Sequence, residues 1–196
     1  MWQRARRKTP RGLSYLVLAI ALLTGACASP GAGTANPGYV SSDGAVRTWP
    51  VETRGEPVSL GGETFTANSI DTAALRGQVV VINSWYASCP PCRAEAPDLV
   101  ALWRQFSGKG VFFFGINGVD EAGSAQAFER TFDIPYESLA DRHGHAIAAL
   151  EGVVPLQAVP TTVVLDREGR VAATFLGVIT PSTLEAVLKD LLAEGN

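Results

Sequence analysis

The chain has 196 residues, of which 46% are apolar and 18% charged, and its formal net charge is −3. These values are ordinary for a globular protein and exclude overall disorder, and the length suits one compact domain with additional segments. The charge is unevenly placed, because residues 1–26 hold five cations and no acid, whereas the remainder has 11 lysines and arginines against 19 acids. The cations of this acidic body are scattered rather than striped, which argues against nucleic-acid binding.

The first 26 residues have the pattern of a targeting segment. A basic start is followed by the apolar run 13–23 and by small residues up to Ala26. This run is too short to span a bilayer, which needs about 20 apolar residues. We therefore predict a signal peptide over residues 1–26 that exports the rest of the chain from the cytoplasm.

A cysteine follows the targeting segment directly. The stretch Leu23-Thr-Gly-Ala-Cys27 resembles the lipobox of bacterial lipoproteins, although Thr24 stands where that family usually has leucine. The resemblance implies that Cys27 is lipidated, becomes the mature N-terminus and anchors the protein to the outer side of the cell membrane. A plain secretory signal and an uncleaved anchor helix are the alternatives, and both also place the body outside the cytoplasm.

The next segment is rich in Gly, Pro, Ser, Ala and Thr and has no apolar periodicity. Such a composition predicts a flexible chain, so we expect residues 27–55 to be a lipidated tether that holds a folded domain off the membrane. The domain itself is expected over residues 56–196.

Apolar patterns within residues 56–196 predict an alternation of strands and helices. Two short strands, 58–60 and 64–66, would form an N-terminal β-hairpin around Gly61 and Gly62. Apolar runs typical of buried strands lie at 79–82, 111–116, 161–165 and 171–175. Helical periodicity is found at 92–106, 122–132 and 183–192. This order predicts an α/β fold in which helices cover both faces of a central mixed sheet.

The motif with the clearest chemistry is Cys89-Pro-Pro-Cys92, which lies between the predicted strand 79–82 and the predicted helix 92–106. A helix N-terminus presents unpaired N–H groups and a partial positive charge, which stabilise a thiolate at Cys89. The spacing lets the second sulfur reach the first, so a disulfide can form and reopen. We therefore predict that Cys89 and Cys92 are catalytic residues of a redox-active dithiol.

A zinc site and a permanent structural disulfide are the alternatives. Zinc normally takes four ligands, and besides Cys27 the sequence offers two histidines, His143 and His145, in a segment that reads as a loop or a helix start. A bridge across so short a loop would constrain the unfolded chain little. We therefore expect redox chemistry with no metal and no cofactor.

These residues resemble the TlpA/ResA-type thiol-disulfide oxidoreductases of the thioredoxin superfamily, over roughly residues 56–196. Beyond the dithiol, the resemblance rests on Trp85, Glu95, Pro97 and the stretch Val159-Pro160-Thr161-Thr162. It implies a thioredoxin fold.

The resemblance also implies roles for three residues outside the dithiol. Pro160 would follow a cis peptide bond, lie against the disulfide, keep metal off the sulfurs and, with Val159, shape the groove for the backbone of a substrate. An ordinary turn proline is the alternative. Trp85 would pack beside the active site, as part of the substrate surface, the core or both.

Glu95 is a candidate proton shuttle for Cys92 by the same resemblance. The alternative is that an acid in the first turn of a helix is favoured by the helix dipole alone. Asn83 occupies the place where cytoplasmic thioredoxins keep a buried acid, so Glu95 would substitute for it. Ser88 stands where the family usually has Trp, which makes the surface beside Cys89 smaller and more polar.

The function that the resemblance implies is a monomeric reductant of disulfides in exported proteins. The usual client in the family is apocytochrome c, whose haem-binding cysteines must be reduced, and a membrane thiol carrier supplies the electrons. A disulfide-forming oxidant of secreted proteins is one alternative. Another is a copper-delivery module of the Sco type, although that type spaces its cysteines by three residues and lacks the cis-proline.

Overall fold

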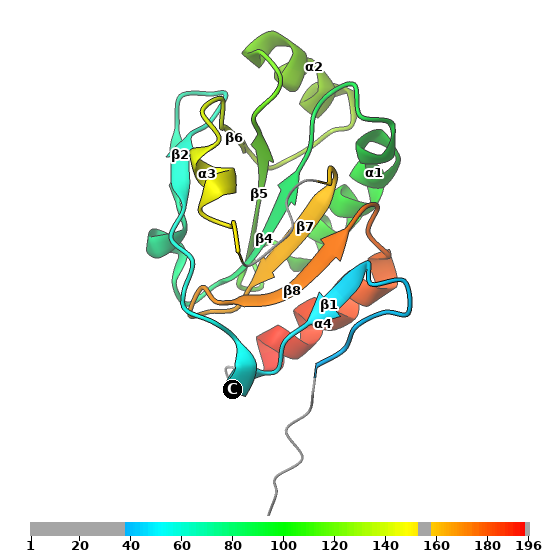
Figure 1. The fold of residues 1–196 in the computed structure, drawn as a ribbon. Helices are drawn as coiled ribbons and strands as arrows, with labels where there is room; N and C mark the ends of the chain where they lie inside the picture. The colour runs from blue at the N-terminus through cyan, green and yellow to red at the C-terminus, as the bar shows by residue number, and fades with distance from the viewer. Residues whose placement is uncertain (1–37, 153–157, 195–196) are drawn as a thin grey trace, which may run out of the picture. The chain divides into compact units, whose positions relative to one another are not determined.

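The computed structural model describes residues 38–152 and 158–194 (Figure 1). The predicted signal peptide and Cys27 lie outside these ranges. The strands are β1 (Val46–Thr48), β2 (Gly61–Glu63), β3 (Ser69–Asp71), β4 (Val79–Ser84), β5 (Val111–Asn117), β6 (Ser138–Ala140), β7 (Thr161–Leu165) and β8 (Val171–Leu176). The α-helices are α1 (Pro90–Phe106), α2 (Ala122–Thr131), α3 (His145–Ala148) and α4 (Pro181–Ala193). Two short 3₁₀ helices are η1 (Val51–Thr53) and η2 (Thr72–Leu75). Among the helices described, none is both long and apolar enough to cross a bilayer.

Six of the strands form one sheet, in the order β1-β8-β7-β4-β5-β6. The central strand β4 runs parallel to β5 and antiparallel to β7, and β6 continues the parallel half. The predicted mixed sheet is thus confirmed, and the four strands expected from apolar runs are its core strands β4, β5, β7 and β8.

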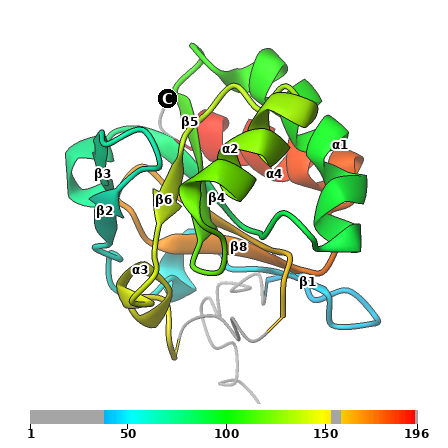
Figure 2. The ribbon, with the colours of Figure 1, turned by 90° about the horizontal axis from the view of Figure 1, so that it is seen from above.

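Side chains that alternate along β4 divide the core between the two faces of the sheet. Val79 and Val81 belong to the cluster that α1 and α4 cover, whereas Val80 and Ile82 belong to the cluster beneath α3 and the β2–β3 hairpin. Figure 2 shows α1 and α4 together on one side of the sheet and α3 with the hairpin on the other. The strand is buried along its whole length because both faces are covered.

The predicted N-terminal hairpin exists, but its strands and turn were assigned wrongly. Gly61 and Gly62 lie inside β2, which pairs antiparallel with β3, and the connection is the later segment 64–68. A Cβ on Gly61 would overlap with the carbonyl oxygen of Ile70 in the partner strand. The glycine is therefore needed for a close approach of two backbones and not for a turn.

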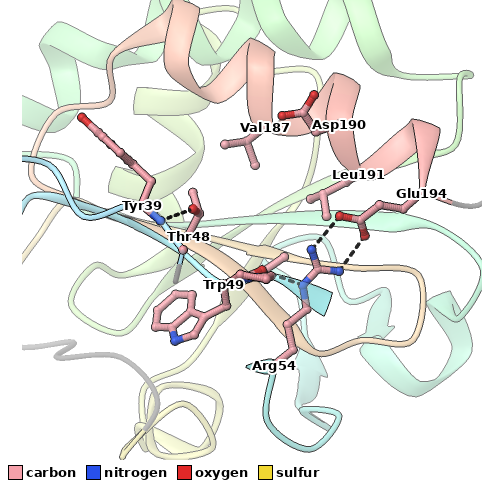
Figure 3. Close-up of a pocket in the computed structure, with 11 residues that line it drawn as sticks. Tyr39, Thr48, Trp49, Arg54, Val187, Asp190, Leu191 and Glu194 are labelled. Carbon is pink, nitrogen blue, oxygen red and sulfur yellow. Dashed lines mark hydrogen bonds and ion pairs between the residues drawn. The ribbon is translucent and has the colours of Figure 1, made fainter. Parts of the chain in front are cut away.

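Residues 38–55, which we expected in the tether, are part of the folded domain. β1 pairs antiparallel with β8 and extends the sheet by one strand. Arg54 fixes the end of this segment, since its guanidinium bonds Asp166 at 3.1 Å and, at 2.6 and 2.7 Å, both carboxylate oxygens of Glu194, the C-cap of α4. Figure 3 shows this arginine in a pocket between the N-terminal segment, with Tyr39 and Trp49, and helix α4.

Candidate active site at the Cys89–Cys92 dithiol

Cys89 and Cys92 lie where the chain leaves β4 and enters α1, as the motif predicted. They are joined by a disulfide, with their Cα atoms 5.3 Å apart. Only 1% of Cys89 and 2% of Cys92 is exposed to solvent, and both pack with Trp85 and with Phe128 of α2. The dithiol therefore lies in an apolar environment at the end of the sheet.

Helix α1 begins two residues earlier than the periodicity indicated, with Cys89 as its N-cap. Pro90 and Pro91 occupy the first two helical positions, where a fixed φ suits the helix and a missing N–H is tolerated. The first backbone donor that reaches the cap is the N–H of Cys92, which lies 3.2 Å from the Cys89 sulfur. A thiolate at Cys89 would thus meet one helical N–H where a helix without prolines offers more.

The loop before the dithiol is anchored by an aspartate that the sequence analysis missed. Asp120 accepts hydrogen bonds from the Ala87 N–H at 2.6 Å and from the side-chain amide of Asn117 at 2.8 Å. Asn117 in turn accepts the N–H groups of Val119 and Asp120. An Asn followed three residues later by Asp at the end of a strand is the signal that could have found this turn.

The bond between Val159 and Pro160 is cis, as the resemblance implied. The Val159 carbonyl oxygen lies 4.0 Å from the Cys89 sulfur, so this loop faces the dithiol. Ser84 at the end of β4 accepts the N–H of Thr161 at 3.0 Å, which fixes the loop to the strand that leads to the cysteines.

Glu95 is a fully buried residue of the dithiol helix α1, and it lies in the second turn rather than the first. The helix dipole is therefore not the reason for an acid at this position. Its carboxylate accepts the side-chain amide of Asn83 at 2.9 Å and the N–H of Ile179 at 3.1 Å. Burial raises the pKa of Glu95 to about 7. The two hydrogen bonds lower this pKa, and the negative charge of Asp98 raises it further.

Two contacts hold the Trp85 indole beside the cysteines, one on the face of the ring and one at its N–H edge. Its ring stacks on Phe128 with centroids 4.4 Å apart, and its indole N–H donates to the Ser138 hydroxyl at 3.1 Å. Trp85, Cys92 and Phe128 also line one small cavity. The tryptophan thus belongs to the core and to the site together.

Of the two histidines, His143 lines a surface pocket that also includes Trp85 and Val159. His143 precedes α3 and His145 begins it, and their rings are 5.7 Å apart. Within residues 38–152 and 158–194, no group of three or more His, Cys, Asp or Glu side chains is placed to hold a metal ion.

A dithiol at a strand-to-helix junction, faced by a cis-proline loop on a central mixed sheet, defines a thiol-disulfide oxidoreductase of the thioredoxin fold. Comparison with known proteins agrees with this class. The profile of the AhpC/TSA family matches residues 58–174, and the chain belongs to that family.

Solved and curated relatives share the same chemistry. A secreted thiol-disulfide isomerase from Corynebacterium glutamicum is 30% identical, with a TM-score of 0.71 over 79% of this chain and 96% of that one. Thiol-disulfide oxidoreductase ResA from Halalkalibacterium halodurans is 26% identical over 67% of this chain and 73% of its own. Thiol:disulfide interchange protein HelX from Rhodobacter capsulatus is 31% identical over 60% of this chain and 62% of its own. The TlpA/ResA-type resemblance is thereby confirmed.

Proposed function

We propose that this oxidoreductase works outside the cytoplasm as a reductant of disulfides in exported proteins. The observation that carries the proposed direction is the cap of α1, where Pro91 has no N–H to give and the Cys89 sulfur accepts from the N–H of Cys92. Strong oxidants of the superfamily stabilise the reduced form through the thiolate. A sulfur with few donors gains less of that stabilisation, so the dithiol gives up its electrons more readily.

The proposed reaction has two exchange steps. The Cys89 thiolate attacks one sulfur of the client disulfide, which forms a mixed disulfide and releases the other client sulfur as a thiolate. The Cys92 thiolate then attacks the Cys89 sulfur and releases the second client sulfur. The client gains two electrons, and the Cys89–Cys92 disulfide forms. A membrane thiol carrier would return two electrons and reopen it.

Glu95 is the proposed proton acceptor for Cys92. It follows Cys92 by one turn of the same helix, and its pKa of about 7 leaves it partly ionised at neutral pH. Asn83 donates to this carboxylate but cannot take up a proton itself. We expect the rate of disulfide exchange to change around pH 7 in the wild type. In Glu95→Gln this pH dependence should vanish, and its survival would remove Glu95 from the proton route.

The client that we propose is apocytochrome c, on the strength of the TlpA/ResA-type resemblance. Val159, Pro160 and Trp85 would form the surface that receives its backbone beside Cys89.

Two variants test the reaction in cells. Cys92→Ser should accumulate mixed disulfides with clients, because no second thiol resolves them, and identifying the trapped proteins by mass spectrometry names the client. The matched variant Cys89→Ser should trap none. Trapping by Cys89→Ser instead would reverse the roles of the two sulfurs.

The alternative function is the opposite direction, oxidation of secreted proteins. The two directions are distinguished by the redox state, in a deletion strain, of the client that the trapping experiment identifies. If this protein is a reductant, its deletion leaves the client with its cysteines oxidised. An accumulation of client with free thiols would overturn the reductant assignment.

We also propose a lipid anchor at Cys27 after removal of residues 1–26. The small-residue run before Cys27 and the secreted relative from Corynebacterium glutamicum support export. Intact mass of the membrane-extracted protein should show a diacylglyceryl-modified Cys27 at the N-terminus. An unmodified chain that begins at another residue would contradict the anchor.

A further inference from the structure

A chain of hydrogen bonds connects helix α2 to the tryptophan beside the dithiol. The Trp85 indole N–H donates to the Ser138 hydroxyl at 3.1 Å, and that hydroxyl donates to the Glu129 carboxylate at 2.9 Å. Ser138 is buried and Glu129 is half-buried. The polar path thus joins the β4–α1 loop to β6, 53 residues further along the chain, and to the preceding helix α2.

The direction of this path is fixed by the chemistry of its three groups. An indole nitrogen can only donate, and a serine hydroxyl has a single proton. Because the Ser138 oxygen accepts the bond from Trp85, its own proton is free to go to an acceptor, which Glu129 supplies. A carboxylate accepts such a bond more strongly than a neutral group does. Without Glu129, the buried hydroxyl loses the partner that orients it.

The surroundings leave the indole edge little freedom. A Cβ on Gly115 of β5 would overlap with both the Trp85 indole nitrogen and the Ser138 hydroxyl oxygen. Phe128, the neighbour of Glu129 in α2, stacks on the indole face. Helix α2 therefore fixes Trp85 in two ways. Phe128 stacks on the face of the indole ring, and Glu129 acts on its N–H edge through Ser138.

The carboxyl group of Glu129 is partly withdrawn from water. Burial is the main cause that raises the pKa of Glu129, and the hydrogen bond from Ser138 acts in the opposite sense. A purely solvating surface acid would not be placed in this way.

We propose that Glu129 is a positioning residue of the oxidoreductase, which acts through Ser138 to hold the Trp85 indole against the Cys89–Cys92 pair. The role rests on the redox activity of that pair and is independent of the client and of the electron donor. The effect of Glu129 would reach the cysteines through Trp85, which packs in one cluster with both of them.

The test compares Glu129→Ala, Ser138→Ala and their combination with the conservative Glu129→Gln, all in the full-length protein. The first readout is the indole N–H resonance of Trp85, assigned by its loss in Trp85→Phe. We expect it to move upfield in Glu129→Ala and in Ser138→Ala, and to stay near its wild-type position in Glu129→Gln, whose amide oxygen still accepts from Ser138.

The second readout is the equilibrium constant of the dithiol in dithiothreitol buffers. A lost hydrogen bond in the path should change this constant by about threefold to tenfold. Glu129→Ala and Ser138→Ala should change it in the same direction, the double variant should add nothing further, and Glu129→Gln should restore most of the wild-type value. Non-additivity of this kind is expected for residues that act in one chain.

Glu121→Ala is the matched control, because it removes an exposed acid at the start of the same helix, where Glu121 pairs with Arg142. It should leave both readouts at their wild-type values. An unmoved indole resonance in Glu129→Ala, or additive effects of Glu129→Ala and Ser138→Ala, would overturn the inference. A wild-type dithiol that does not equilibrate with dithiothreitol would instead overturn the redox function, and the resonance would still decide the role of Glu129.

Discussion

Asn83 in β4 donates its side-chain amide to the carboxylate of Glu95 in α1 over 2.9 Å, and both residues are buried. The same amide also donates to the Thr162 hydroxyl at 3.1 Å, so it ties the dithiol helix to the strand that follows the cis-proline. Of these three side chains, only Glu95 can change its charge. The protonation state of Glu95 therefore sets the charge of this buried group of side chains.

The first prediction is that Glu95 makes the oxidised protein less stable as the pH rises. Its pKa is about 7 in the folded protein and near 4.5 when exposed, so between these values the folded state binds the proton and the unfolded state does not. The linkage relation then requires the free energy of unfolding to fall with pH in this window, by about 3 kcal/mol in total. Urea unfolding at several pH values measures it.

Glu95→Gln is the control for this prediction, since it keeps the shape and removes the titration. Its free energy of unfolding should change by about 3 kcal/mol less than that of the wild type between pH 4 and pH 8. Parallel curves for the two proteins would show that Glu95 has an ordinary pKa.

The second prediction concerns the space at Gly115. Gly115→Ala would push a methyl group against Trp85 and Ser138, and overpacking of this kind costs about 1–3 kcal/mol. Thermal unfolding should show the loss. Gly123→Ala is the matched control, because a Cβ at this exposed position of α2 meets nothing and alanine is a better helix former than glycine by about 1 kcal/mol. If Gly115→Ala is as stable as Gly123→Ala, the close approach of Gly115 to the indole edge does not exist.

Much of the fold could be predicted because the central strands are continuous apolar runs. β4, β5, β7 and β8 are buried on both faces, and such strands are recognisable from composition alone. β1 and β6 have three residues each and lie at the edges of the sheet. Such short strands form because a partner strand is already in place, and no local sequence pattern predicts them.

The candidate site divides in the same way. The dithiol and the cis-proline were predicted because each belongs to a local motif. The contacts of Glu95 with Ile179 and of Trp85 with Ser138 join residues 84 and 53 positions apart, so they depend on how the elements pack. The error at Gly61 has a related cause, since a glycine that serves a close backbone approach reads in sequence like a glycine that serves a turn.

The third prediction tests whether residues 38–55 are fixed by Arg54. Replacing this buried arginine by methionine leaves Asp166 with Arg170, at 2.8 Å, but removes the partner of Glu194. We expect a loss of about 1.5–3 kcal/mol in the free energy of unfolding, measured with urea. In Arg47→Met, which removes an arginine that lies over Trp49, the loss should stay below about 1 kcal/mol. Equal losses would mean that Arg54 does not anchor the segment.

The last prediction concerns the reduction potential and follows from the two prolines at the start of α1. The side chain of a helix cap accepts from the N–H of the second or third helical residue. Here the third residue, Cys92, supplies that donor, and the second, Pro91, has none to give. The wild-type potential should therefore lie on the reducing side of about −220 mV, a value within the glutaredoxin range.

Pro91→Ala restores the missing N–H and should raise this potential. A hydrogen bond to a charged sulfur is worth about 1.5–3 kcal/mol, and about 1.4 kcal/mol corresponds to 30 mV for a two-electron couple, so the expected rise is about 30–60 mV. Pro90→Ala is the matched control, because the N–H at the first helical position is not aimed at the cap and the potential should change by less than about 10 mV. Equilibration with dithiothreitol and glutathione buffers measures all three proteins. A wild-type value near −150 mV would favour the oxidant, and equal shifts in the two variants would mean that the donors at the cap do not set the potential.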